Sequence, residues 1–595
     1  MTDHSSPRFG AARRKILAAC LAAALTAGAA AHSQLRIAPS DRASPMFSGL
    51  SQASRMADAR KAAPAHPFVS IPVTTCADAG SGSLREATAL ANDGDEIDLR
   101  GLELLCSTIT LESGAIALDV NATVQGPGSD ALTIDGGNTD RVFYSTAGLT
   151  ISDLTISHGN HAGGDGGCIV VYGADLTLTR SVVTDCHAGD GNNAQSRGGG
   201  AFVGGSLYMQ ASTISLSSAS ASDRAYGGGA FAVRDVYLDS SIVAENTATS
   251  SEDASHGGGV STLFGSVSMV NGSRVANNIA QSTLGPAAGG GIFASGAISL
   301  LMSAAIGNDA ESEAATSYGG GMHSGALGVN ADDYTIALVL STLSGNTATT
   351  NCSDCRSVGG GAHASGAILA IYGLIYDNRV IAPSELALAS GGGLATTRAG
   401  INGRISLVNN TLSGNRAAGG DLGYGGGLAT TAGSPFFVYS STIAHNEGSH
   451  FGGGATGNGG LLQSTIVANN EAPIGTNADI SPSYPFDPIA ISGENNIVIA
   501  SSSGVSFLNE PLHEDPLLLP LADMGGLTLT HALGVGSPAL DAGANNLNSV
   551  FDQRFCPFAR DSGSAVDIGA FEQPTTSIDY VFAHGFDTIL LECDP

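Results

Sequence analysis

The chain has 595 residues, of which only 13% are charged and 5% aromatic, with 82 glycines and no tryptophan. This composition excludes a charge-rich disordered chain and an ordinary helical enzyme, and it favours short strands joined by many tight turns. The formal net charge of −29, with no lysine after Lys61, argues against a nucleic-acid partner or an anionic membrane surface.

The N-terminus carries the pattern of an export signal. A basic cluster ending at Lys15 precedes an alanine-rich apolar stretch that ends near Ala31, which predicts a secretory signal peptide over residues 1–31. Cys20 lies too close to Lys15 for a lipoprotein cleavage site, so we assign it to the signal peptide. Residues 32–70 are rich in Ala, Ser and Pro without a sustained period, which predicts a flexible leader.

A short helix is predicted next, in "SLREATALAN". Leu84, Ala87 and Thr88 share one helical face, and Ser83 is placed to cap the N-terminus. We assign residues 71–100 to an N-terminal cap for the repeats that follow.

Glycine triplets recur beyond residue 100 in steps of 27 to 40 residues. They begin at Gly198, Gly227, Gly257, Gly289, Gly319, Gly359, Gly391, Gly425 and Gly452. Between them lie short apolar-alternating stretches such as "SLYMQAS", and no window keeps a helical period. Each unit is too small to bury a core alone and becomes stable only by stacking on equivalent units. Residues 101–510 therefore predict a coil of parallel strands with about a dozen turns, roughly 60 Å long at about 4.8 Å per turn.

An asparagine follows each of several triplets, three residues after an apolar Val, Ile or Leu; Asp309, Cys186 and Ser217 take that slot in three other units. The asparagines are Asn246, Asn278, Asn346, Asn378, Asn415, Asn446 and Asn469. In stacked coils this slot recurs directly above itself, so the amides can hydrogen-bond in a ladder at one corner. We expect the glycine triplets, which tolerate positive φ and close stacking, at the opposite corner.

These repeats also carry a family resemblance. "GGGIF" followed by "STLSGN" resembles the repeats of right-handed parallel β-helix proteins of the polymorphic outer-membrane type. "GSLREATALAN" is similar to the CSLREA segment that precedes many such helices, with Gly82 in place of the cysteine. "GSPALDAG" and "DIGAFE" are similar to the choice-of-anchor Q segment that follows β-helices in secreted bacterial proteins, with Phe555 where that pattern has glycine. The resemblance spans residues 76 to 572 and implies an all-β right-handed parallel β-helix (solenoid) with a short N-terminal capping helix.

The residues after the repeats fall into two parts. Residues 511–573 hold charges of both signs in turns, which predicts a hydrogen-bonded cap over the open end of the coil. These charged residues are Asp541, Asp552, Arg554, Arg560, Asp567 and Glu572. Residues 574–595 predict a short C-terminal sorting tail, too few for a membrane barrel, and no stretch after the signal reaches the length of a membrane-spanning helix.

Eight cysteines remain after signal cleavage, an even number that indicates disulfides in an exported chain. They are Cys76, Cys106, Cys168, Cys186, Cys352, Cys355, Cys556 and Cys593. Pairing in sequence order is the simplest hypothesis, although spacing alone does not determine connectivity. For Cys352 and Cys355, a loop disulfide is favoured over a redox or metal pair, because no second CxxC and no βαβ pattern accompany them.

One column of larger side chains follows the triplets. Phe202, Phe231, Phe293, His323 and His363 each stand two places after a triplet, next to residues whose larger members are aliphatic and assigned to the interior. Strand alternation then turns this column outward, as a binding stripe of aromatic rings and imidazoles; the alternative is that the rings stack only for stability or point inward. Two histidines without a third ligand in register do not predict a metal site.

An enzyme is the rival hypothesis, because the same fold hosts polysaccharide lyases and glycoside hydrolases. Such chemistry needs two carboxylates about 5 to 10 Å apart, or acidic calcium ligands with a basic residue, and the acids of the repeats show no such register. No cofactor is expected: the acidic surface could hold calcium, but "GGDGG" lacks the continuing nonapeptide pattern of a calcium coil.

Taken together, these features predict a monomeric exported protein, extracellular or on the outer cell surface, with the periplasm as the alternative. Its predicted role is a β-helix scaffold that binds a glycan or a surface protein, in the manner of an adhesin. The alternative is a polysaccharide lyase or glycoside hydrolase that acts on an extracellular polymer.

Overall fold

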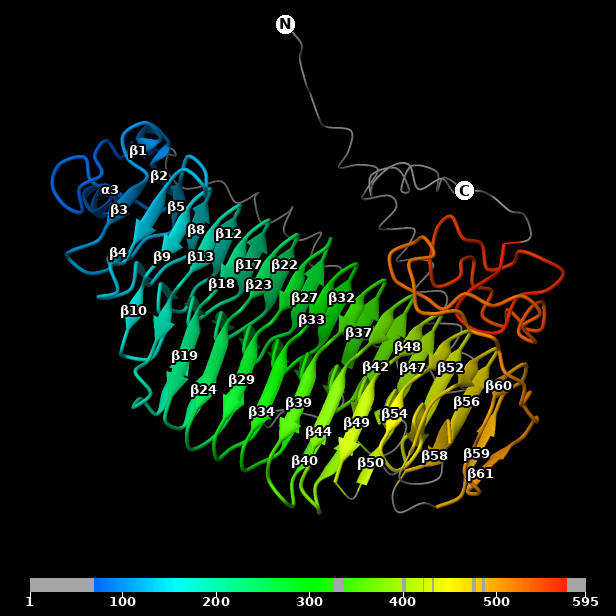
Figure 1. Ribbon diagram of the computed structural model, residues 1–595. Coiled ribbons are helices and arrows are strands. Elements are labelled where there is room, and N and C mark those ends of the chain that lie inside the picture. The colour runs from blue at the N-terminus through cyan, green and yellow to red at the C-terminus, as the bar shows by residue number, and fades with distance from the viewer. Residues whose placement is uncertain are drawn as a thin grey trace, which may run out of the picture.

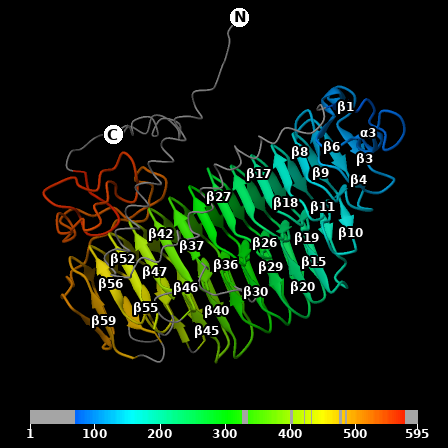
Figure 2. The same cartoon turned by 180° about the vertical axis from the view of Figure 1, so that it is seen from behind.

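The chain forms one long stack of coils (Figures 1 and 2). The computed structural model describes residues 69–574, apart from 326–334, 399–402, 421, 431–432, 474–477 and 484–486. The predicted signal peptide, nearly all of the leader, the C-terminal tail and Cys593 lie outside the described residues. Nearly every described element is a strand, and the named strands pair in parallel with the coils before and after them. This confirms the predicted fold class, an all-β parallel β-helix with one short N-terminal helix.

Each complete coil contributes one strand to each of five sheets. In one coil the order is β21 (Ala230–Ala232), β22 (Val236–Asp239), β23 (Ile242–Ala244), β24 (Thr247–Ser250) and β25 (Ser255–His256). These strands belong to sheets C, A, B, D and E, in that order. The next coil begins with β26 (Val260–Thr262), which returns to sheet C.

The five sheets differ in length. Sheet A has 16 strands, from β1 (Ser70–Pro72) to β61 (Val505–Phe507), and sheet B has 14, from β3 (Thr108–Thr110) to β60 (Ile497–Val498). Sheet C has 13 strands, from β4 (Ile116–Leu118) to β58 (Ile480–Pro482). Sheet D has 10, from β10 (Asn160–His161) to β54 (Glu447–Gly448), and sheet E has 8, from β15 (Gln195–Arg197) to β50 (Leu422–Tyr424).

Two separate interiors result from this arrangement. Sheets A, B and C surround the main core, which is filled by aliphatic side chains such as Val236, Leu238 and Val243. Sheets D and E pack on each other through small residues such as Ala225 and Ala248, and form a flat two-layer projection, called the fin below. Because alanine buries little apolar area, the fin needs other interactions to hold its two layers together.

The N-terminal helix α3 (Leu84–Leu90) packs against the first coils. Ser83 caps it by accepting a hydrogen bond from the Glu86 amide, as predicted, and Leu84, Ala87 and Thr88 are buried. Leu84 and Ala87 belong to the main core, so the helix covers part of its N-terminal end.

Left-handed residues form the corners of the coil. Sheet A passes to sheet B through single residues with φ near +50°, for example Ser240 (52°) and Tyr372 (54°), and sheet B passes to sheet D through Glu245 (59°) and its equivalents. A non-glycine residue in this region costs about 1 to 2 kcal/mol. The coil repeats that cost on successive turns, so the stacking of strands must offset it.

The asparagine ladder lies at the junction between sheets B and D. The backbone amide and the side-chain amide of Asn246 both donate to Oδ1 of Asn278, at 3.0 and 2.9 Å, and Asn246 Nδ2 also donates to the Ile214 carbonyl. The same pattern continues to Asp479, which accepts from Asn470 at the C-terminal end. Its members are Asn246, Asn278, Asn308, Asn346, Asn378, Asn415, Asn446 and Asn470.

Two ladder positions differ from the prediction by one residue. Asn470, not Asn469, and Asn308, not Asp309, occupy the ladder. The prediction counted three residues from an aliphatic residue that was taken to face the core. That count is wrong by one when the outward-facing neighbour is aliphatic too, as Ile306 is beside the inward-facing Ala305. Asn469 instead forms the left-handed corner, with φ of 58°.

The glycine triplets face the asparagine ladder directly, so their predicted place at the opposite corner is wrong. A Cβ on Gly228 would lie 2.3 Å from the backbone carbon of Thr247, and one on Gly229 would lie 2.9 Å from Cγ of Asn246. The first glycine, Gly227, has φ of 59°. Each triplet therefore meets three needs: a left-handed turn, close contact between two passes of the same coil, and space for the asparagine side chain. We call this junction the neck of the fin.

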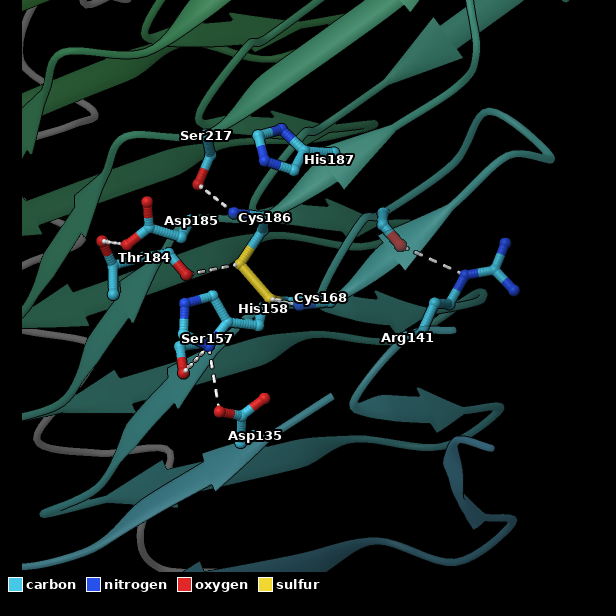
Figure 3. Close-up of a disulfide and its surroundings, with 12 residues drawn as sticks. Asp135, Arg141, Ser157, His158, Cys168, Thr184, Asp185, Cys186, His187 and Ser217 are labelled. Atoms are coloured by element: carbon cyan, nitrogen blue, oxygen red, sulfur yellow. Dashed lines mark hydrogen bonds and ion pairs between the residues drawn. A yellow bond between two sulfur atoms is a disulfide. The ribbon is translucent and has the colours of Figure 1, made fainter. Parts of the chain in front are cut away.

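A disulfide crosses the neck where the fin begins (Figure 3). Cys168 aligns with the third glycine of the next triplet, and Cys186 aligns with Ser217 and hence with Asn246. The Cys168–Cys186 bond thus joins the same two passes that asparagine and glycine join in later coils. Its position shows that these passes must be held together from the first coil of the fin onward.

The other described cysteines follow sequence order, as the simplest hypothesis has it. Cys76 bonds Cys106 near the N-terminal helix, and Cys352 bonds Cys355 in the turn between β39 (Thr347–Thr350) and β40 (Arg356–Val358). Cys556 is also disulfide-bonded.

Leu512, near the start of the segment after the repeats, pairs with β60, the last strand of sheet B, and the later residues of the segment pack along the flank of the last coils (Figure 1). Gly569 donates to the Ser464 carbonyl, Thr442 accepts from the Ala570 amide, and Phe555 packs on Tyr372. Arg554, bound to Asp552 at 2.6 Å, lies inside this segment between aromatic rings. The segment packs on the flank because sheet B and its corner carry apolar and hydroxyl side chains in these last coils.

We expect Asn470→Ala to lower the free energy of unfolding by roughly 2 to 4 kcal/mol, because it leaves several buried hydrogen-bonding groups unpaired. Asn469→Ala, one residue away at an exposed corner, should cost about 1 kcal/mol or less. Urea unfolding of both variants measures the difference. Equal losses would contradict the assignment of the ladder.

The neck also predicts a new disulfide. Gly229→Cys combined with Asn246→Cys should oxidise spontaneously during export, because these residues stand where Cys168 and Cys186 stand in an earlier coil. The control combines Gly229→Cys with Glu245→Cys, at the left-handed corner residue just before Asn246. Free thiols are counted by mass spectrometry after alkylation. Two free thiols in the variant with Gly229→Cys and Asn246→Cys would contradict the alignment of these residues with Cys168 and Cys186.

Candidate functional site

The predicted binding stripe lies in one register column of sheet C. Phe202 pairs with Phe231, Phe293 with His323, and His323 with His363 on successive coils. Their side chains point away from the main core, but they are buried, with exposures between 1% and 8%. The exposed stripe expected from strand alternation is therefore not formed.

Sheet E is what covers this column. The neck turns the chain so that sheet E borders the outer face of sheet C, and Tyr226, His256 and Tyr318 of sheet E pack their rings against it. Ser261 interrupts the column between Phe231 and Phe293, and His256 fills that gap by stacking on Phe293 at 4.3 Å. Alternation predicted the direction of these side chains, but not the second sheet that buries them.

The rings form one unbroken series, called the aromatic column below. It comprises Tyr144, Tyr172, Phe202, Phe231, Tyr226, His256, Phe293, His323 and His363, with neighbouring centroids 4.3 to 5.9 Å apart. Contacts at this distance stabilise by about 0.5 to 1.5 kcal/mol each beyond burial. The buried part of the column therefore serves the packing of the fin on the coil.

The histidines in the column are buried bases. Nδ1 of His363 lies 2.8 Å from Nδ1 of His323, and its Nε2 lies 3.0 Å from the hydroxyl of Thr397. Burial lowers the pKa of His363 to about 3 and that of His256 to about 4, so both rings are neutral near pH 7. The described residues contain no group of three ligands able to hold a metal ion.

The aromatic column becomes accessible at its N-terminal end. Tyr172 is 38% exposed there, and Tyr144 is partly exposed. Arg141, Asp165 and Arg197 complete what we call the Arg–Tyr cluster. Sheet E begins with β15, two coils after sheet C begins, so no earlier strand of sheet E covers the rings of Tyr144 and Tyr172.

Within the cluster the two arginines have different roles. Arg197 forms two hydrogen bonds with the carboxylate of Asp165 and lies 4.7 Å above the ring of Phe202. Arg141 donates through Nε to the carbonyls of Asp165 and Gly166, and its terminal nitrogens extend beyond them (Figure 3). Burial lowers the pKa of Arg141, and the tyrosines and Asp165 act in the opposite direction.

Burial also raises the pKa of Tyr172, so its hydroxyl stays protonated and can donate a hydrogen bond. Spacing in the sequence does not indicate this cluster, because its residues precede the first full triplet. The usable signal was "GGC" at Gly166–Cys168, a triplet with cysteine as its third member, which marks the start of the fin.

A depression lies on sheet A near the same end. Thr123, Thr150 and Thr177 line it as one outward column, with Asn121 and Asp175 at its edge. Asn121 Oδ1 already accepts from the Gly148 amide, and Asp175 accepts from the Ser206 amide. Since these polar groups stabilise the coil corner, this depression offers fewer unused groups than the Arg–Tyr cluster.

Two carboxylates share one face of β34 (Asp309–Ser312), a juxtaposition that the repeat spacing does not indicate. Asp309 and Glu311 are two residues apart on a strand, hence roughly 7 Å apart at about 3.3 Å per residue. Burial, followed by the charge of Glu311, raises the pKa of Asp309 to about 6. A carboxyl group with a raised pKa near a second carboxyl group is an arrangement that glycoside hydrolases use.

Comparisons with known proteins add little beyond the fold. No family model matches the chain, and no curated protein matches it. One solved structure that it resembles is the crystal structure of pectate lyase Pel9A, with 12% identity and a TM-score of 0.26, over 85% of this chain and 96% of that one. No helix among the described residues has the length and apolarity to cross a membrane.

Acid should destabilise the protein through His256. Its pKa is lowered on folding, so its contribution to stability is complete above pH 6.5 and falls by about 1.4 kcal/mol per pH unit down to about pH 4. His256→Phe keeps an aromatic ring stacked on Phe293 but removes the group that titrates. It should therefore reduce the dependence of the unfolding free energy on pH by the contribution of one proton. Urea unfolding between pH 6.5 and 4.5 measures it. Phe293→Leu, the control, should lower stability equally at each pH, and an unchanged slope in His256→Phe would contradict the argument.

Proposed function

We propose that the protein is an exported β-helix scaffold that binds an extracellular glycan at the Arg–Tyr cluster. The observation that carries this proposal is the exposed end of the aromatic column, where the partly exposed rings of Tyr144 and Tyr172 lie beside the guanidinium of Arg141. Sugar rings bind proteins through stacking on aromatic faces and through hydrogen bonds from fixed polar groups.

The cluster is already held in place before a ligand arrives. Arg197 is fixed by Asp165, Arg141 by two backbone carbonyls, and the rings by their neighbours in the column. Preorganised groups lose little entropy on binding, which favours affinity for a flexible polymer. The disulfides support export, because such bonds persist in oxidising compartments.

An enzyme is the second candidate, and the carboxyl pair of β34 favours it. Glu311, which accepts from Gln281 on the preceding coil, would serve as base or nucleophile, and Asp309, whose pKa burial raises to about 6, as acid. The substrate of such a hydrolase would be an extracellular polysaccharide lying across sheet D.

A panel of neutral and acidic polysaccharides tests both candidates. We expect retention of the protein in affinity gels by at least one of them, and a loss of affinity of about tenfold, or about 1.4 kcal/mol, in Tyr172→Ala and in Arg141→Ala. Tyr208→Ala, which removes a stacked tyrosine from sheet A, is the matched control and should bind normally.

New reducing ends are measured in the same samples. Cleavage that disappears in Glu311→Gln would replace the binding proposal by the hydrolase. Retention that is equal in Tyr172→Ala and the control would place the glycan elsewhere, and the absence of retention would favour a protein ligand.

A further inference from the structure

A serine and a histidine meet where the C-terminal segment docks on sheet B. Ser413 ends β48 (Thr411–Ser413), and His531 belongs to the segment 118 residues later. Nε2 of His531 lies 2.9 Å from Oγ of Ser413, and Nδ1 lies 2.7 Å from the carbonyl oxygen of Leu519.

The backbone carbonyl determines how this pair is protonated. A carbonyl oxygen only accepts hydrogen bonds, so Nδ1 of His531 must carry the proton of the neutral ring. Nε2 is then the acceptor, and the hydroxyl of Ser413 donates to it. Leu519 is itself held by a hydrogen bond from its amide to the Ala532 carbonyl, next to the histidine. The arrangement is that of a nucleophile, a base and a group that orients the base.

The ring is also kept in the form that a base requires. His531 is 2% exposed, and burial lowers its pKa, opposed by its bond to Leu519. The nearby titratable ring is His445, with centroids 5.2 Å apart, and burial lowers its pKa as well. Both imidazoles are therefore neutral near pH 7.

The pair is buried, and exposed residues adjoin it. Ser413 is 5% exposed, and its neighbour Gly414 is exposed, as is His445 on the next coil. A Cβ on Gly414 would meet only the Asp377 amide nitrogen, at 3.9 Å. Gly414 also supplies the amide directly after the serine, the position from which serine hydrolases donate one oxyanion hydrogen bond.

We propose that Ser413 is a nucleophile and His531 its general base, in a site that hydrolyses esters of an extracellular acyl-bearing substrate. Oγ of Ser413 attacks the acyl carbon while its proton moves to Nε2 of His531. The alcohol leaves with that proton, and an acyl-serine remains. Water then attacks the acyl carbon, passes a proton to Nε2, and the carboxylic acid leaves as Ser413 takes the proton back. The reaction needs no cofactor.

This activity is independent of glycan binding at the Arg–Tyr cluster, which lies near the other end of the stack (Figure 2). It depends instead on docking of the C-terminal segment, because the nucleophile belongs to the coil and the base to the segment. The sequence alone could not pair them, since Ser413 lies in a repeat whose equivalents, such as Ser344, have no histidine partner in the described residues.

A serine-reactive fluorophosphonate and 4-nitrophenyl acetate test the proposal on the full chain. We expect the fluorophosphonate to modify Ser413, as mapped by peptide mass spectrometry. Ser413→Ala and His531→Asn should each lower kcat/KM for the ester at least 100-fold. Ser344→Ala, the equivalent position two coils earlier, is the control and should react as the unchanged protein does.

Folding is checked separately by thermal unfolding. If Ser413→Ala unfolds, Ser413→Cys replaces it as the test, because cysteine keeps the approximate size and the hydrogen bond of the serine. Its thiol should be alkylated faster than the thiol of the double variant Ser413→Cys with His531→Asn. Failure of the fluorophosphonate to modify Ser413, ester hydrolysis at an unchanged rate in a folded Ser413→Ala, or equal alkylation of the two cysteine variants would each overturn the proposal.

Discussion

The contact across the neck is the constraint on which the rest of the structure depends. There two passes of one coil approach so closely that Gly228 cannot carry a side chain, and the space beside Gly229 is filled by Asn246. A buried amide is costly unless all its groups are paired, and the ladder pairs them with the coils before and after. Glycine and asparagine are thus two halves of one interaction, and each would be destabilising without the other. The fin, built from alanine and serine, has little apolar burial of its own and is held mainly by this contact and by its strand pairing.

The same contact decides which side chains can meet a ligand. By placing sheet E beside sheet C, the neck converts a row of phenylalanines and histidines into a buried packing surface, as the low exposure of Phe231 and His363 indicates. Sheet E begins only with β15, and the column ends beside that point with Tyr172 partly exposed. The proposed glycan site therefore lies where the fin begins. The Cys168–Cys186 bond lies at this boundary and holds the first neck closed beside the open rings.

Sequence reasoning reached the features that repeat. The triplets and the asparagine period were sufficient for the parallel β-helix, and strand alternation correctly turned Phe202 away from the main core. The sequence pattern did not predict the role of single positions correctly, and it did not predict contacts between segments that are distant in the chain. Asn469 and Asn470 both follow aliphatic residues, so spacing could not separate a corner from a ladder position. Nothing local to Phe202 indicates that a second sheet covers it, and nothing near Ser413 indicates a histidine 118 residues away.

A coil of this composition uses most of its polar groups for itself. Ladder asparagines bond to one another, serines such as Ser255 and Ser357 bond to carbonyls inside the fin, and corner residues such as Asp175 bond to amides of the next coil. Groups that are already paired are poor ligands and poor catalysts, because binding a substrate would break bonds that hold the coils together. Chemistry then requires residues that the repeat does not supply. Arg141 and Tyr172 come from the coils where the fin begins, and His531 comes from a segment outside the repeats. For this reason the two ends of the stack, and not its regular middle, are where both proposed activities lie.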